Sequence, residues 1–257
     1  PSDPRFRLVH EGRRGSYAAR NAGAAVAIGD VLAFTDSDCL PRADWLRAGV
    51  AVLYGDLRPD AVGGAIEMVF RNGKAPESGP EHYDAYDGLP QQEHFITTYP
   101  FAATANMFVR AEAFRAAGPF DAAFTSGGDR EWGARLAAIG GRFAYAPGAV
   151  VDHPTRPTWA ELTRKSRRIA HGMADLDAAQ PVHAALLGIA VEALGGLYFY
   201  IELWTWDQPS RASQKLAFAA AYWWARGLRT AIRLRRLLLR GMPGRRAAPT
   251  TTGAPSR

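Results

Sequence analysis

The chain has almost no cysteine: Cys39 is the only one among its 257 residues. A single cysteine excludes an intramolecular disulfide and a metal site built from cysteines, and it fits a reducing compartment. The first residues are polar and lack the apolar core of a signal peptide, and the first residue is not methionine. We therefore expect a cytoplasmic protein whose given sequence starts inside a longer one.

Acidic residues are absent from 226–246, a stretch rich in arginine that contributes to a formal net charge of +6. Such a block attracts anionic surfaces, either lipid headgroups or nucleic acid, although a solvated helix face explains most runs of charge. Because this basic stretch is amphipathic, we expect peripheral association with the inner face of the cell membrane. The bulk composition, with 47% apolar and 22% charged residues, is that of a folded globular protein.

Hydrophobic patterning predicts an α/β fold. Residues 5–9 have the pattern of a strand, 18–27 that of an alanine-rich helix and 31–34 that of a strand buried on both faces, which together make a βαβ unit. We expect a mostly parallel sheet flanked by helices. Asp36 and Asp38 directly follow the strand at 31–34, and the carboxyl ends of strands are where open α/β sheets bind ligands.

The rest of the chain divides into a mixed part and a helical part. The mixed part is expected to continue with helices at 43–54, 112–117 and 130–139, strands at 61–69, 105–110 and 142–146, and a long loop at 71–95. The helical part is expected to contain helices at 159–177, 182–204 and 210–239. We therefore predict an α/β domain over 1–157, a basic helical region over 158–240 and a disordered tail over 241–257.

The most apolar stretch of the chain is 186–206. It contains Glu192 and Glu202, and a carboxylate is costly inside hydrocarbon. We expect this stretch to be buried or interfacial rather than to span a membrane.

The sequence Phe-Thr-Asp-Ser-Asp at 34–38 places two carboxylates, Asp36 and Asp38, at the end of a strand. Two such carboxylates can hold Mg²⁺ or Mn²⁺, which prefer oxygen ligands and keep coordination positions for phosphate. The metal would neutralise the charge on a departing diphosphate. Aspartate is also common in turns and caps, so a loop cap is the alternative for this motif alone. Cys39, next in the chain, has no evident catalytic base beside it and is expected to serve packing.

Together with its surroundings, this motif resembles the central signature of family 2 glycosyltransferases. The signature is carried by Ala19-Arg20-Asn21-x-Gly23, Ala27-x-Gly29-Asp30, Phe34-x-Asp36-x-Asp38 and Trp45-Leu46, and a second block by Asn106-Met107, Gly118-Pro119-Phe120-Asp121, Gly128-Asp129 and Arg135. The resemblance covers residues 5–156. It implies a GT-A fold and transfer of a sugar, mostly with inversion, from a UDP-linked or other nucleotide-linked donor. It also implies that 1–157 is a partial catalytic domain without the family's N-terminal nucleotide-binding βαβ segment, so we expect weakened donor binding.

The resemblance implies roles for particular residues. Asp38 is the main metal ligand, Asp36 contacts the metal or the donor ribose, and Arg20 and Asn21 lie near the nucleotide and its phosphates. His153 stands where the wider GT-A fold can place a histidine that completes the metal or diphosphate site. A hydrogen-bonded structural histidine is the equal alternative for this residue.

Asp129 aligns with the family's catalytic base, the carboxylate that takes the proton of the acceptor hydroxyl. The family often has glutamate directly before this aspartate, whereas this chain has Gly128, so the roles of Asp129 and Glu131 can be exchanged. The alternative is that Asp129 only caps the helix at 130–139. A helix N-terminus favours the ionised form of Asp129. Glu131 is spaced to pair with Arg135 on the same helix.

We predict metal-dependent transfer of a sugar from a nucleotide-sugar donor, a UDP-sugar above all, to a glycan or lipid-linked acceptor, with no nucleic-acid partner. Two alternatives stay open. A nucleotidyltransferase also holds metal with carboxylates at strand ends, although no glycine-rich phosphate loop precedes the motif. A basic nucleic-acid-binding or membrane-binding module on a degenerate catalytic domain is permitted by Tyr222, Trp223 and Trp224 beside arginines. No helix-turn-helix or zinc pattern supports that second alternative.

Overall fold

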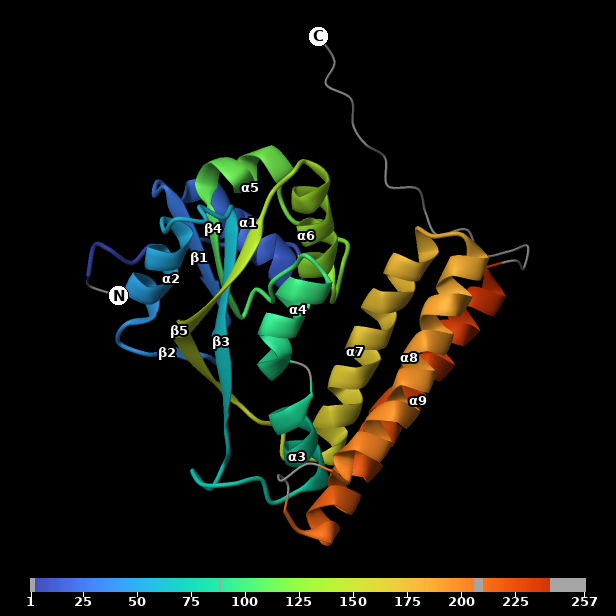
Figure 1. Ribbon diagram of the computed structural model, residues 1–257. Coiled ribbons are helices and arrows are strands. Elements are labelled where there is room, and N and C mark those ends of the chain that lie inside the picture. Colours follow the sequence, from blue (N-terminus) through green and yellow to red (C-terminus); the bar gives the residue numbers. More distant parts are fainter. Residues whose placement is uncertain (1–2, 88, 206–209, 241–257) are drawn as a thin grey trace.

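The computed structural model describes residues 3–87, 89–205 and 210–240, which form a sheet part and an adjoining helical part (Figure 1). Within those residues five strands make one sheet in the order β1-β4-β3-β5-β2. The strands are β1 (Val31–Thr35), β2 (Leu40–Pro41), β3 (Ala61–Val69), β4 (Asn106–Arg110) and β5 (Phe143–Pro154). The expected α/β class is confirmed.

The sheet is mixed. β4 lies antiparallel between β1 and β3, β3 runs parallel to β5, and β2 pairs antiparallel with the far end of β5. This corrects the expectation of a mostly parallel sheet. The strand expected at 5–9 is wrong: in the described residues β1 is bonded to a neighbour on one side only, and 5–9 pair with no strand. Without a neighbour to accept and donate backbone hydrogen bonds, an apolar pattern alone makes no strand.

Helices cover both faces of the sheet. They are α1 (Ser16–Val26), α2 (Trp45–Leu53), α3 (Gly79–Tyr86), a short 3₁₀ turn (Leu89–Gln91), α4 (Gln92–Thr98), α5 (Ala111–Ala117) and α6 (Gly128–Ala138). Alternation along β4 separates two cores: Met107 faces the one that includes α1, α5 and α6, whereas Phe108 faces the one that includes α2. Trp132 of α6 is fully buried in the first core.

The long loop expected at 71–95 is wrong over much of its length, because this segment contains α3, the 3₁₀ turn and the start of α4. α3 begins with a reciprocal cap. The Ser78 hydroxyl accepts the amide of Glu81 at 3.2 Å, and the Glu81 carboxylate accepts the amide of Ser78 at 3.2 Å. The Ser-x-x-Glu spacing is visible in the sequence, but the surrounding glycine, proline and acidic residues favoured a loop.

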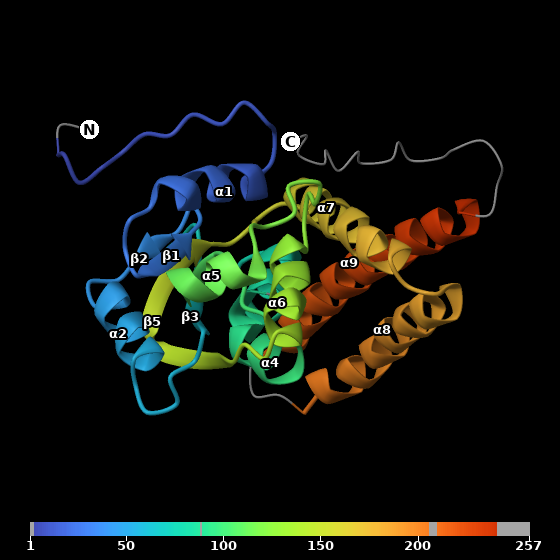
Figure 2. The same cartoon turned by 90° about the horizontal axis from the view of Figure 1, so that it is seen from above.

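The helical part consists of α7 (Trp159–Ala178), α8 (Val182–Leu203) and α9 (Ala212–Leu239), with α9 between α7 and α8 (Figure 2). These helices agree closely with the ranges expected from the sequence. α3 packs against α9, and a third core there includes Tyr83, Leu162, Phe218 and Tyr222. This contact attaches the helical part to the sheet part.

α8 leaves an apolar face uncovered. Its exposed side chains are Val182, Leu186, Leu187, Val191 and Leu194. In the part of the chain that the structure describes, no helix is both long enough and apolar enough to cross a membrane. The tail predicted to be disordered, 241–257, lies outside the described residues.

Candidate active site

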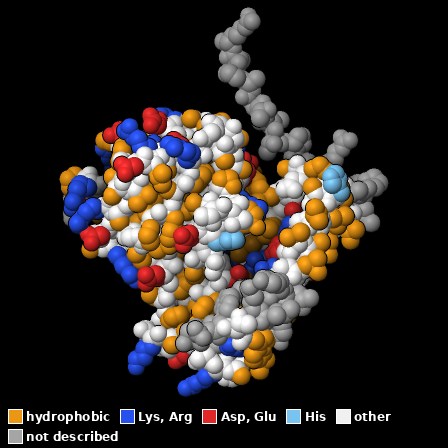
Figure 3. All heavy atoms as spheres, viewed as in Figure 1, with side chains coloured by type: hydrophobic (Ala, Val, Ile, Leu, Met, Phe, Trp, Pro, Cys, Tyr) orange, Lys and Arg blue, Asp and Glu red, His pale blue; other side chains and the backbone are white. Residues whose placement is uncertain are grey.

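A cavity of about 570 Å³ opens between the sheet part and α7. Its lining comes from the start of α1, the end of β1, the segment from the end of α3 to β4, the start of α6 with the turn before it, the end of β5, one face of α7 and Arg229 of α9. Figure 3 shows the surface hollowed between the sheet part and the helical part. Of the residues predicted for the site, Arg20, Asp36, Asp129 and His153 line this cavity.

Asp129 is half-buried in the first turn of α6 and is held by hydrogen bonds from two other segments. Its Oδ1 accepts the Tyr17 hydroxyl at 3.2 Å, and its Oδ2 accepts the Thr104 amide at 3.4 Å. The Tyr17 oxygen also accepts the Asp129 amide at 3.2 Å. The carboxylate is thus positioned by α1 and by the segment before β4 while it lines the cavity.

Desolvation raises the pKa of Asp129 above the ordinary value for aspartate. The amide of Arg130, the Arg20 guanidinium and the hydrogen bonds from Thr104 and Tyr17 act in the opposite direction but are outweighed. Burial therefore opposes the effect expected from the helix N-terminus, and the pKa of Asp129 lies above its ordinary value. A carboxyl with a raised pKa is a better proton acceptor once ionised.

The turn before α6 explains the glycine at position 128. The N-cap residue is Gly127, in the left-handed region at φ 80°, and it has no side chain to cap the helix. Asp129 Oδ1 accepts the first-turn amide of Arg130 at 3.0 Å, so Asp129 also acts as a cap for α6. A Cβ at Gly128 would lie 2.7 Å from the Tyr17 ring. The ring that holds Asp129 occupies the space that a glutamate at 128 would need.

Arg20 and Asn21, adjacent on α1, face different surroundings. Arg20 forms an ion pair with Asp36 at the end of β1, and its guanidinium lies 5.3 Å from the centre of the Tyr17 ring. Asn21 donates to the Phe120 carbonyl at 2.7 Å and accepts the Phe120 amide at 2.9 Å. Asn21 therefore joins α1 to the segment after α5 and is not in the cavity lining.

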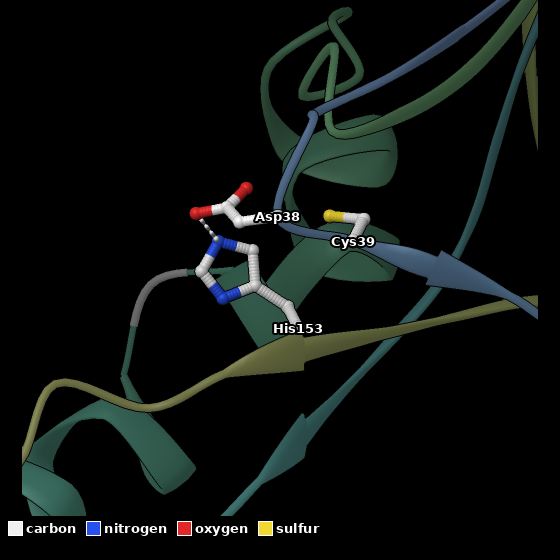
Figure 4. A group of neighbouring side chains, drawn as sticks. All are labelled: Asp38, Cys39 and His153. Atoms are coloured by element: carbon white, nitrogen blue, oxygen red, sulfur yellow. Dashed lines mark ion pairs between the residues drawn. The ribbon is translucent and has the colours of Figure 1, made fainter. Parts of the chain in front are cut away.

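Asp38, Cys39 and His153 form a group whose potential ligand atoms all lie within 4.8 Å of one another (Figure 4). Asp38 Oδ2 is 4.0 Å from His153 Nε2. The other ring nitrogen, Nδ1, lies 2.8 Å from the Pro154 carbonyl, which can only accept, so Nδ1 carries the proton and Nε2 presents a lone pair. Burial, assisted by the charge of Arg156, lowers the pKa of His153 and keeps the ring neutral.

The β2–β5 ladder brings this group together. Leu40 pairs with Asp152, so Cys39 and His153 are the next opposed residues. A neutral imidazole nitrogen and an exposed carboxylate suit a divalent cation. Burial raises the pKa of the Cys39 thiol, which favours the protonated form without a metal.

Two cations of the site, Arg156 after β5 and Lys165 in α7, are held by a buried carboxylate of α3. Lys165 Nζ lies 2.6 Å from one oxygen of Asp84 in α3, and Arg156 Nη1 lies 3.2 Å from the other oxygen. Burial acts to raise the pKa of Asp84, but the two cations outweigh it and lower that pKa. A second hollow, of about 460 Å³, is lined by Asp38 and shares Arg156, Lys165 and Arg168 with the first.

Glu131 lies apart from Asp129. Its carboxylate pairs with Arg135 one turn later at 2.7 and 3.0 Å, as the spacing predicts. Arg135 also donates to the carbonyl of Ala117, the last residue of α5, and to that of Pro119 two positions later. Glu131 lines a different hollow, between α6 and the C-terminal helices.

Sequence reasoning missed Tyr17, Asp84, Arg156, Lys165 and Arg168 as site residues. Arg156 carried a weak signal, since it follows His153 by three positions. The others belong to helices whose local pattern is no different from that of any amphipathic helix.

Residues 1–117 match the model of the family described as Glycosyl transferase family 2. A curated relative, Glycosyltransferase AglE of Haloferax volcanii, is 36% identical over 165 residues, which are 64% of this chain and 52% of the relative. The Pre-mycofactocin glycosyltransferase of Mycobacterium tuberculosis is 30% identical over 192 residues, 73% of this chain and 40% of the relative. The match of residues 1–117 to this family agrees with the resemblance found in the sequence signature.

The chain spans about half the length of the curated relatives it matches, or less. Among solved structures, the crystal structure of S. aureus TarS 1-349 is 14% identical, with 88% of this chain and 71% of that chain covered, at a TM-score of 0.38.

Proposed function

We propose that this protein transfers a sugar from a nucleotide-sugar donor, a UDP-sugar above all, to a hydroxyl group of a glycan or lipid-linked acceptor, with inversion at the anomeric carbon. The observation that carries the proposal is a shared cavity: Asp129 lines the same space as the Arg20–Asp36 pair and the cations Arg156, Lys165 and Arg168. The similarity of residues 1–117 to family 2 glycosyltransferases supports sugar transfer over nucleotidyl transfer and over nucleic-acid binding.

The cations of the cavity suit the diphosphate of the donor. Arg156 and Lys165 are held in place by the buried carboxylate of Asp84, so they are oriented before any ligand binds. Charge-assisted hydrogen bonds to phosphate oxygens are stronger than neutral ones, and they strengthen further where water is partly excluded. We assign Arg156, Lys165 and Arg168 to the diphosphate, and Arg20 with Asp36 to the nucleoside side of the donor.

Mg²⁺ or Mn²⁺ fits beside Asp38 and His153. The Asp38 carboxylate and the His153 Nε2 lone pair are the ligands, and Asp36, two positions earlier, is a further candidate. When bound, the ion neutralises charge that develops on the leaving diphosphate.

Asp129 acts as the general base. The acceptor oxygen attacks the anomeric carbon, its proton passes to the Asp129 carboxylate, and the bond from the anomeric carbon to the diphosphate oxygen breaks. One displacement of this kind inverts the configuration. Tyr17 and Thr104 orient the carboxylate through their hydrogen bonds. Glu131 is a poorer candidate, because its carboxylate is paired with Arg135 outside this cavity.

A thermal-shift titration of the 257-residue chain with a panel of nucleotide sugars, with and without Mn²⁺, tests donor binding. We expect metal-dependent stabilisation by one donor, and its loss in Asp38→Ala. Asp129→Asn should keep the stabilisation while losing transfer to the acceptor. Donor stabilisation that is undiminished in Asp38→Ala, or sugar transfer that survives in Asp129→Asn, would overturn the proposal.

We further propose peripheral association with the inner face of the cell membrane through the helical part. Near the packing contact of Ile189 with Leu237, α8 presents its apolar face and α9 presents exposed Arg235 and Arg236. Arg236 also pairs with Asp175 of α7 at 2.7 Å. This combination suits the interface of an anionic bilayer. Sedimentation with vesicles containing phosphatidylserine should show salt-sensitive binding that is reduced when both arginines are replaced by Gln. Equal binding to uncharged phosphatidylcholine vesicles would exclude the role of charge.

A further inference from the structure

We propose that Asp38, Cys39 and His153 also form a binding site for a thiophilic divalent cation of the Zn²⁺ class, with the Cys39 sulfur as a ligand. The sequence by itself suggested only packing for this cysteine. The proposal concerns the cation alone, so it does not depend on sugar transfer. It adds a sulfur ligand to the oxygen and nitrogen ligands expected from Asp36, Asp38 and His153.

The group is built into the fold by two adjacent segments. Because Leu40 pairs with Asp152 in the antiparallel β2–β5 ladder, Cys39 and His153 lie opposite each other and their side chains leave the same face of the sheet. The Cys39 amide donates to the Asp36 carbonyl at 3.1 Å, which closes the turn before β2. Figure 4 shows the Cys39 sulfur and the Asp38 carboxylate next to the His153 imidazole ring.

The distances require only a small adjustment. In a tetrahedral zinc site the ligand atoms stand about 3.5 Å apart, as follows from metal–ligand bonds of about 2.0–2.3 Å. Here all three lie within 4.8 Å of one another, with 4.0 Å between Asp38 Oδ2 and His153 Nε2. The Asp38 side chain is 54% exposed, so it can rotate toward the other two ligands without disturbing the core. A fourth position remains for water or a phosphate oxygen.

The ligand types select the ion. Sulfur and imidazole nitrogen favour Zn²⁺ and Co²⁺, whereas Mg²⁺ prefers oxygen alone. The hydrogen bond from His153 Nδ1 to the Pro154 carbonyl orients the ring and leaves Nε2 as the ligand atom. On binding, the thiol proton of Cys39 passes to the solvent, because metal-bound sulfur is a thiolate. Since Asp38 is also the proposed ligand of Mg²⁺ or Mn²⁺, a bound Zn²⁺ would prevent these ions from binding to its carboxylate.

A Co²⁺ titration of the chain without nucleotide tests the proposal. The sequence contains one cysteine, so a sulfur-to-cobalt charge-transfer absorption can come only from Cys39. We expect this absorption to saturate at one Co²⁺ per chain, to disappear when Zn²⁺ is added and to persist when Mg²⁺ is added at the same concentration. Its absence at saturating Co²⁺ would overturn the assignment.

Substitutions identify the ligands. Cys39→Ser should abolish the absorption and weaken Zn²⁺ binding by at least about tenfold. Substitution of residues that only hydrogen-bond to a metal ligand already lowers metal affinity by that factor. Asp38→Asn, at an exposed position, should keep the absorption but weaken Zn²⁺ binding to a similar extent. It tests the site independently if Cys39→Ser, a substitution at a buried position, impairs folding. Asp44→Asn, another exposed aspartate, is the matched control and should change neither. Equal Zn²⁺ affinity in Cys39→Ser and the unaltered chain would refute the sulfur ligand, whatever the donor titration shows.

Discussion

At the scale of single residues, Asp129 combines a buried carboxyl with a raised pKa. Because the folded state holds the proton more tightly than the unfolded state, stability falls as pH rises from about 3.9 through the raised pKa. Asp129→Asn removes this dependence. We expect the free energy of unfolding of Asp129→Asn, relative to that of the unaltered chain, to increase as pH rises through this range. Urea unfolding at several pH values measures this difference. A difference that stays constant with pH would show that the carboxyl is not perturbed.

The same substitution bears on the proposed chemistry. Without a proton acceptor at position 129, we expect the rate of sugar transfer to fall by about 10²- to 10⁴-fold. Glu131→Gln is the comparison, since Glu131 pairs with Arg135 away from the cavity. A larger loss in Glu131→Gln than in Asp129→Asn would reverse the assignment of the base.

Tyr17 acts on Asp129 through its hydroxyl, which donates to Oδ1 and accepts the backbone amide. Tyr17→Phe removes a hydrogen bond that favours the ionised carboxylate, so the pKa of Asp129 should rise further and the acidic limb of the pH–rate profile should move to higher pH. Stability should fall by about 1–2 kcal/mol, as for other lost hydrogen bonds in partly buried surroundings. Tyr54→Phe, at a position 46% exposed, is the control and should leave the profile in place.

At the scale of elements, α7 is placed by its close approach to the turn before α6. A Cβ at Gly172 would lie 2.0 Å from the Ser126 carbonyl oxygen, a backbone atom that cannot move alone. Gly172→Ala should therefore destabilise the protein by about 1–3 kcal/mol. It should also lower kcat/KM, because the displaced turn leads into Gly127 and Asp129.

Gly195→Ala provides the matched control for this contact. Gly195 lies in α8, and a Cβ there would meet nothing within 4 Å. Alanine has the higher helix propensity, so we expect unchanged or slightly greater thermal stability, by up to about 1 kcal/mol. If both variants lose the same stability, the close approach of α7 is not the cause.

At the scale of the whole molecule, Asp84 joins α3 to α7 and to the residues after β5. Asp84→Asn would leave Lys165 and Arg156 without their anionic partner, and removing one member of a buried ion pair costs about 3–5 kcal/mol. Because the pKa of Asp84 is lowered in the folded state, its contribution is present above about pH 3.9 and is lost as pH falls through the lowered value.

Urea unfolding measures both effects of Asp84. Asp44→Asn breaks an exposed ion pair with Arg47 and should change the free energy of unfolding by less than about 1 kcal/mol. A similarly small change in Asp84→Asn would mean that the buried pair does not connect the two parts.

Local sequence patterns predicted most helices and three strands correctly. The helices α7, α8 and α9 and the strands β1, β3 and β4 lie close to the ranges expected from periodicity, and the Glu131–Arg135 pair follows from a four-residue spacing. These features depend on neighbours within one or two helical turns. The family signature likewise depends on short motifs whose order is visible in the chain.

The sequence by itself therefore determined the α/β class, the helical C-terminal part and the resemblance to family 2 glycosyltransferases. Only the tertiary structure decided that 5–9 form no strand, because a strand requires a partner across a ladder. It also decided the site's arrangement: Tyr17 bonds to Asp129 across 112 positions, and the β2–β5 ladder sets Cys39 opposite His153. The tertiary structure also decided the pKa of Asp129, because desolvation of this carboxyl depends on all the segments that pack around it.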